Sequence, residues 1–90
     1  MAIKRKCYFK GGVQSLRFPV GKGKEASVGA VSPGKWDFGI AKSPEQIAVL
    51  TGSLKINGIK LKYAESIRIK VGERIVIEAK KHASYLCEYD

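Results

Sequence analysis

Residues 45–63 read EQIAVLTGSLKINGIKLKY: a strongly apolar run over 45–51 ends at Gly52, and apolar residues then alternate with polar ones from Leu54 to Tyr63. Side chains on a β-strand point alternately to its two faces, so a period of two predicts strands with one buried face. The pair Asn57-Gly58 separates two such runs. Both central positions of a type I′ turn need a positive φ, which asparagine and glycine tolerate best. The segment therefore predicts an antiparallel β-hairpin with its turn at residues 57–58.

The same alternation extends from this hairpin in both directions. Apolar residues alternate from about residue 13 onward, and turn signals recur at short and even intervals, as at Pro33-Gly34 and Gly72-Glu73. A last strand is predicted over residues 84–89, and no long segment has a convincing helical period. We expect an all-β protein whose antiparallel sheet closes or folds onto itself, as a small barrel or sandwich, in one domain over residues 1–90.

Composition limits the classes of function. The chain has 90 residues, of which 44% are hydrophobic and 28% charged, as is typical of a one-domain globular protein. The basic start, residues 1–6, is not followed by the apolar region of a signal peptide, and no apolar run is long enough to cross a bilayer. We therefore expect a cytoplasmic protein that does not act at a membrane. One histidine, His82, and two isolated cysteines, Cys7 and Cys87, do not predict a metal site.

The net charge of +9 has two interpretations. Lysines such as Lys55 and Lys60 alternate with apolar residues along the predicted strands, which is typical of a sheet with one face in solvent. A nucleic-acid-binding barrel would add exposed aromatic residues between basic ones on one sheet face, and only Tyr8, Phe9 and Tyr63 could serve. A nucleic-acid partner is therefore the less favoured alternative.

From Gly34 onward, the spacing resembles the first sequence motif of the cupin β-barrels, Gly-x5-His-x-His-x(3,4)-Glu-x6-Gly. Gly34 and Gly52 take the two glycine positions, and Glu45 takes the glutamate position one residue early. Ile40 and Lys42 stand where the two metal-binding histidines would be. The resemblance implies a cupin-type (jelly-roll) β-barrel of antiparallel strands that holds no metal.

Three further blocks carry a more specific resemblance. They are Ala-Ser-Val-Gly at residues 26–29, Pro-Gly-x-Trp-x-Phe-Gly at 33–39 and Tyr-Leu-Cys-x-Tyr at 85–89. In this order they resemble the pyrimidine/purine nucleoside phosphorylase family of small cupins. The resemblance implies metal-independent cleavage of many pyrimidine and purine nucleosides by inorganic phosphate, without a cofactor, to a free base and ribose 1-phosphate. It also implies a homodimer.

Departures from the family pattern keep a second function open. Ile40, Glu25 and Glu73 differ from the residues common at these positions. A cupin barrel that has lost both metal and catalysis, and that binds a small anionic or sugar ligand, is the alternative.

Two residues beside the former metal position are candidates for catalysis. Phosphorolysis needs a cationic phosphate site and a group that stabilises the charge developing on ribose. Lys42 is expected to hold phosphate as a point charge, and Glu45 to bind ribose hydroxyls or to stabilise the cation. The simpler interpretations are a solvated loop lysine and a carboxylate that caps a turn or pairs with a lysine.

Five further residues are candidates for substrate binding. Trp36, Phe38 and Tyr85 could stack on a base, because stacking tolerates every base. Trp36 and Phe38 lie two residues apart and so also fit a core or a dimer interface. Arg68 and Arg74 could bind phosphate, or could lie on the exposed face of an alternating strand.

Overall fold

A computed structural model describes residues 3–90, which form ten strands and one short 3-10 helix. The helix is η1 (Phe9–Gly11). The strands are β1 (Lys4–Tyr8), β2 (Val13–Gly21), β3 (Lys24–Val31), β4 (Gly34–Ile40), β5 (Glu45–Thr51), β6 (Leu54–Ile56), β7 (Ile59–Leu61), β8 (Ser66–Ile69), β9 (Arg74–Ala79) and β10 (Ala83–Tyr89).

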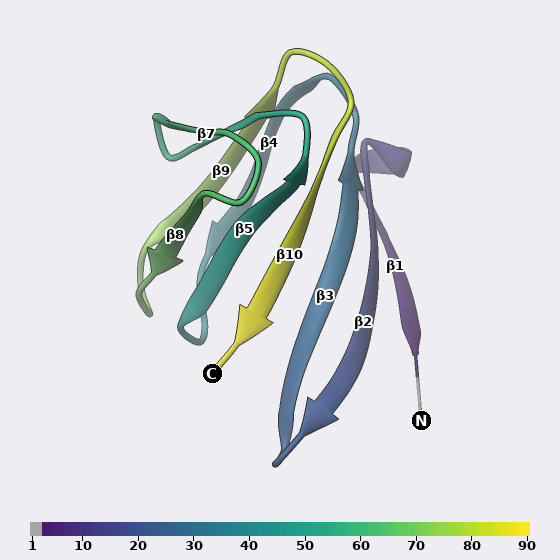
Figure 1. Cartoon of the computed structure of the whole chain (residues 1–90), viewed down its shortest axis with the longest axis vertical. Coiled ribbons are helices and arrows are strands. Elements are labelled where there is room, and N and C mark those ends of the chain that lie inside the picture. The colour runs from purple at the N-terminus through teal and green to yellow at the C-terminus, as the bar shows by residue number, and fades with distance from the viewer. Residues whose placement is uncertain (1–2) are drawn as a thin grey trace.

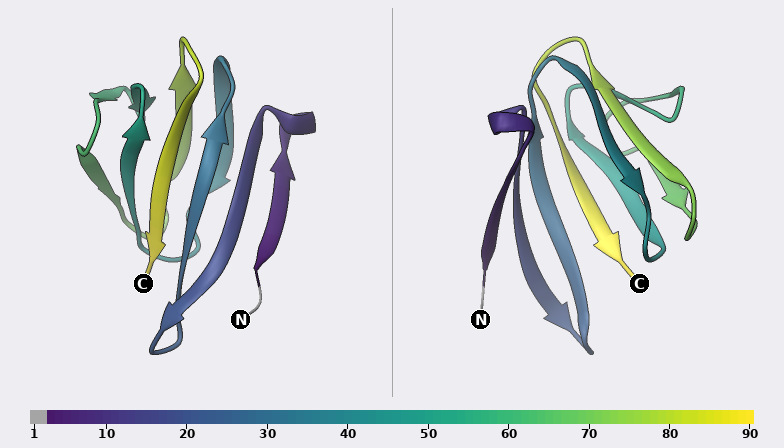
Figure 2. Two further views of the ribbon diagram at one scale, coloured as in Figure 1. Left: turned by 45° about the vertical axis from the view of Figure 1, so that its right-hand side comes forward. Right: turned by 180° about the vertical axis from the view of Figure 1, so that it is seen from behind.

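The strands form two antiparallel sheets. The larger sheet has the order β1-β2-β3-β10-β5-β8, and the smaller has the order β4-β9-β6-β7. Figures 1 and 2 show the smaller sheet facing one part of the larger one, while the β2–β3 hairpin projects beyond it. Among residues 3–90, no helix is long and apolar enough to cross a membrane.

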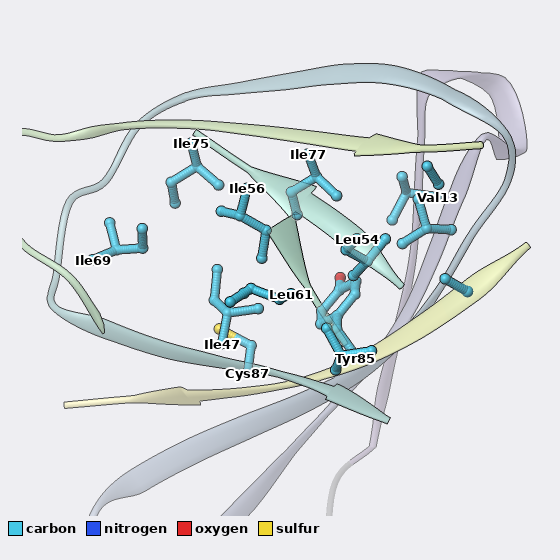
Figure 3. Close-up of a cluster of buried hydrophobic side chains, with 14 of the residues drawn as sticks. Val13, Ile47, Leu54, Ile56, Leu61, Ile69, Ile75, Ile77, Tyr85 and Cys87 are labelled. Atoms are coloured by element: carbon cyan, nitrogen blue, oxygen red, sulfur yellow. The ribbon is translucent and has the colours of Figure 1, made fainter. Parts of the chain in front are cut away.

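The core lies between the two sheets and consists mostly of the inward-facing residues of the alternating strands. Figure 3 shows side chains from both sheets pointing toward one another in this space. The largest fully buried side chains include Leu54, Ile56 and Ile69. Burial of one face of each strand is the physical reason for the period of two in the sequence.

The predicted hairpin is confirmed. Leu54 pairs with Leu61 and Ile56 with Ile59, so Asn57 and Gly58 are the two residues of the turn. Their φ values are 50° and 81°, as a type I′ turn requires. The turn is also tied to β9, because the Oδ1 atom of Asn57 accepts a hydrogen bond of 2.8 Å from the Val76 amide.

Two expectations differ from the structure. The all-β antiparallel class is confirmed, but closure into a barrel is not, because the described strands pair within two separate sheets and packing of apolar side chains joins the layers.

The chain also forms a strand before residue 13. Among the strands of residues 3–90, this strand, β1, pairs only with β2, and its residues are exposed apart from the half-buried Tyr8. It therefore has no apolar alternation that sequence analysis could detect.

Candidate functional site

A cavity of about 380 Å³ lies between the sheets, beside the loop of residues 41–44 that joins β4 to β5. Its lining combines charged, polar, aromatic and apolar side chains from both sheets. The charged and polar members are Arg17, Lys42, Ser43, Glu45 and Cys87; the aromatic ones are Tyr8, Phe38, Tyr85 and Tyr89; the rest are Ile40, Ala41, Ile47, Ile75 and Ile77.

Strand register places several of these residues together on the inner face of the larger sheet. Tyr89 of β10 pairs with Glu45 of β5. Arg17 of β2 and Cys87 of β10 both lie opposite Ser27 of β3. Residues directly opposite one another in an antiparallel ladder project from the same face. Segments distant in the sequence thus contribute neighbouring side chains to one wall of the cavity.

Glu45 is held by a buried thiol. The Sγ atom of Cys87 donates a hydrogen bond of 3.1 Å to Oε1 of Glu45. Cys87 is 2% exposed, and burial, followed by the nearby Glu45 carboxylate, raises the pKa of its thiol. Because a raised pKa keeps the thiol protonated, Cys87 remains a donor that fixes the orientation of the carboxylate.

Arg17 is held on one edge and on one face. Its Nε and Nη2 atoms lie 3.2 Å and 3.1 Å from the same Oε1 atom of Glu25. The centre of its guanidinium group lies 4.0 Å from the centroid of the Tyr89 ring, which is cation–π geometry. The hydroxyl of Tyr89 is in turn 3.0 Å from Oγ of Ser27. Burial raises the pKa of the Tyr89 hydroxyl, which therefore stays protonated.

An aromatic group forms another part of the wall. Phe38 and Tyr8 meet edge to face, with ring centroids 5.3 Å apart. Tyr85 is 6% exposed, and burial raises the pKa of its hydroxyl to about 12. Its ring lies over Gly29, where a Cβ atom would come within 2.3 Å of it. Figure 3 shows Tyr85 and Cys87 pointing from β10 toward Ile75 and Ile77 of the smaller sheet.

The cavity brings together four of the seven residues proposed from the sequence. Lys42, Glu45, Phe38 and Tyr85 all line it. Lys42 is exposed and forms no ion pair within residues 3–90. Ile40 and Lys42, at the positions of the cupin histidines, offer an alkyl group and an ammonium, and neither is a ligand for a metal cation.

The other three residues lie outside the cavity lining. Trp36 packs against Phe9, with ring centroids 5.3 Å apart, and its indole N–H donates to the carbonyl of Ser32 at 2.9 Å. Packing of this kind agrees with the core interpretation of Trp36.

The two arginines proposed for phosphate binding each pair with an aspartate. Nη1 of Arg74 donates to both carboxylate oxygens of Asp37, at 3.1 Å and 2.9 Å. The amide of Gly39, together with Arg74, holds the pKa of Asp37 below its usual value. Arg68 pairs with the exposed carboxylate of Asp90. Both arginines are exposed.

Sequence reasoning did not assign Arg17, Tyr89 or Cys87 to the site. The sequence does contain an indication for Arg17. It lies an even number of residues from the buried Val13 and Ser15 on β2, so its side chain projects from the same face of the strand. A cation at an inward position of an alternating strand is unusual, and such a position is where a functional or ion-paired arginine would be sought.

Comparisons with known proteins agree with this architecture. A family model described as pyrimidine/purine nucleoside phosphorylase matches residues 3–89. A protein of that name from Vibrio campbellii is 33% identical over an alignment of 95 positions, which covers 99% of each chain. The crystal structure of a Vibrio parahaemolyticus protein of unknown function is 34% identical, covers 98% of both chains and has a TM-score of 0.86. A cupin-2 domain protein from Rhodospirillum rubrum, at 14% identity over 98% of this chain and 69% of its own, has a TM-score of 0.76 and shares the fold.

Proposed function

The chain belongs to the pyrimidine/purine nucleoside phosphorylase family, and from this we propose that it cleaves pyrimidine and purine nucleosides with inorganic phosphate. A phosphate oxygen forms a bond to the anomeric carbon of ribose as the bond from that carbon to the base nitrogen breaks. The electron pair of the broken bond leaves with the base, which takes up a proton from solvent. The products are a free base and ribose 1-phosphate.

The observation that carries this proposal is the composition of the cavity beside residues 41–44. A single space of about 380 Å³ offers cations, one carboxylate and aromatic rings. These are the groups that an anionic nucleophile, an electron-poor ribose and a planar base require. Ile47 of β5, with Ile75 and Ile77 of β9, adds apolar side chains to the lining from both sheets.

In the proposed arrangement, Lys42 contacts phosphate, because its ammonium is exposed at the loop and has no competing carboxylate in the described structure. Glu45 faces the ribose, where a carboxylate both accepts hydrogen bonds from hydroxyls and stabilises a developing positive charge. Phe38 and Tyr85 contact the base. We propose no catalytic role for a metal ion, and we place Trp36, Arg68 and Arg74 outside the site.

The test is a product analysis with purified protein. Uridine and adenosine are incubated separately with inorganic phosphate, with and without a chelator, and free base and ribose 1-phosphate are quantified. We expect the two products in equal amounts, at a rate that depends on phosphate and does not change with the chelator. Base release that continues at the same rate without phosphate would instead indicate hydrolysis.

A parallel thermal-shift series separates catalysis from simple binding. A ligand that binds only the folded state raises the melting temperature. Stabilisation by a nucleoside or phosphate without any product would identify the protein as a non-catalytic cupin and would contradict the proposal.

A further inference from the structure

We infer that Arg17, on β2, is a binding residue for inorganic phosphate in the cavity. The inference rests on the proposed phosphorolysis, in which phosphate is the second substrate. No sequence motif marks this arginine; its position follows from the pairing of β2 with β3 and of β3 with β10.

Arg17 leaves some of its hydrogen-bond donors available to a ligand. A guanidinium carries N–H donors on all three of its nitrogens and accepts no hydrogen bond. Nε and Nη2 both approach a single oxygen of Glu25. Within residues 3–90, no hydrogen bond involves Nη1 of Arg17. The end of the fork formed by the two terminal nitrogens is therefore free to bind two oxygens of one anion, which is the geometry that phosphate favours.

Contacts on two sides hold the Arg17 guanidinium in place before any ligand binds. Glu25 fixes one edge of the guanidinium, and Tyr89 covers one face at 4.0 Å. The hydrogen bond between Tyr89 and Ser27 holds that ring in place. A side chain that is already ordered loses little conformational entropy when it binds a ligand. Arg17 thus offers a fixed fork, whereas Lys42, in the same lining, is an exposed point charge that no ion pair holds within residues 3–90.

The surroundings of Arg17 differ from those of Arg74. Arg74 forms a comparable pair with Asp37, but both partners are more than half exposed and Arg74 does not line the cavity. Arg17 and Glu25 are 30% and 39% exposed, so hydrogen bonds to the Arg17 guanidinium are less weakened by solvent. The net charge of +9 further favours the approach of an anion.

The experiment measures binding of inorganic phosphate alone, by calorimetry, to the whole protein and to Arg17→Gln, Arg17→Lys and Arg74→Gln. We expect Arg17→Gln to bind phosphate about ten- to hundredfold more weakly, because a hydrogen bond to a charged group is lost. Arg17→Lys keeps the charge but not the fork, and should fall between Arg17→Gln and the unmodified protein. Arg74→Gln should bind like the unmodified protein. A folded Arg17→Gln variant with unchanged phosphate affinity would overturn the inference.

A second measurement uses the unmodified protein and so does not depend on the folding of a variant. Phenylglyoxal modifies arginine, and peptide mass spectrometry reports the rate at each position. Phosphate should slow modification of Arg17 and leave that of Arg74 unchanged. Equal effects at both positions would contradict a site at Arg17.

Kinetics then distinguish this inference from the function on which it rests. Phosphate that binds at Arg17 in a protein that releases no base would refute the phosphorolysis and leave the anion site. Base release by Arg17→Gln with an unchanged KM for phosphate would refute the site and leave the phosphorolysis.

Discussion

Both the sequence and the structure assign Glu45 to the candidate site. It occupies the glutamate position of the cupin-like spacing, and the structure places it in the cavity with its carboxylate held by the Cys87 thiol. A neutral hydrogen-bond donor orients a carboxylate without cancelling its negative charge. Glu45 therefore remains able to stabilise positive charge on a ribose beside it.

Removal of this charge tests its role. Glu45→Gln keeps the size of the side chain and an oxygen that can accept the thiol hydrogen bond, so we expect the fold to persist. We expect kcat to fall about 100-fold, as when one preorganised electrostatic group is removed from an active site. Glu78→Gln is the control, because Glu78 pairs with Lys35 at 4.0 Å outside this cavity. A Glu45→Gln enzyme as fast as the Glu78→Gln enzyme would exclude Glu45 from the mechanism.

We expect titration of the Tyr85 hydroxyl to lower the stability of the folded protein in alkali. Burial raises the pKa of its hydroxyl from 10.0 to about 12 in the folded protein, with a smaller opposing effect from Ser15. Between pH 10.0 and about 12, the folded state therefore retains a proton on Tyr85 that the unfolded state has released. The contribution of this group to the free energy of unfolding is complete below pH 10.0 and is lost as the pH rises through about 12. The free energy of unfolding, measured with urea across this range, should decline less steeply for Tyr85→Phe. Equal slopes for the two proteins would contradict the assignment.

At the scale of elements, the contact between β3 and β10 determines the shape of the cavity wall. Tyr85 lies opposite Gly29, and its ring occupies the space that a side chain at Gly29 would need. The glycine in the Ala-Ser-Val-Gly block thus has a packing role, because its backbone φ does not require glycine. A strand residue without a side chain lets the aromatic ring lie close to the sheet.

Gly29→Ala is expected to destabilise the protein. Alanine in a strand would gain roughly 0.5–1 kcal/mol over glycine from backbone entropy. The added Cβ would lie 2.3 Å from the Tyr85 ring, and overpacking of this kind costs about 1–3 kcal/mol, so the clash outweighs the gain. Urea unfolding measures the difference. In a Tyr85→Leu background the same substitution should cost less, and an equal cost there would show that the ring is not the cause.

At the scale of the whole molecule, the resemblance predicts a homodimer. The outer face of the larger sheet leaves Leu16 and Leu50 exposed, at 44% and 37%, in one groove with Val28 and Ala30. Burial of such an apolar face between two copies would favour association.

Sedimentation equilibrium tests this expectation. We expect a mass of twice 9.9 kDa for the unmodified protein and dissociation for Leu16→Lys, because the new charge would be buried without a partner. Ile59→Lys, at a 52% exposed position in the smaller sheet, is the control and should remain dimeric. A monomeric unmodified protein would refute the dimer, and a dimeric Leu16→Lys variant would refute the choice of face.

Much of the architecture is encoded locally. Asn57 and Gly58 specify their turn because few other residues tolerate two successive positive φ values, and the alternation around them specifies which face of each strand is buried. The spacing from Gly34 to Gly52 likewise points to Lys42 and Glu45, and both line the cavity. Strand β1 could not be predicted in this way, because an exposed edge strand leaves no apolar pattern.

Local periodicity, turn chemistry and ordered motifs are enough to establish the all-β class, the hairpin at residues 57–58 and the family. Which charged and aromatic residues share a cavity depends instead on how distant strands pair. Arg17, Glu45 and Tyr89 line one cavity because the four strands β2, β3, β10 and β5 pair in a particular register. Arg68 and Arg74 are exposed and pair with aspartates. Register between distant strands results from the packing of the whole core, and no local pattern records it.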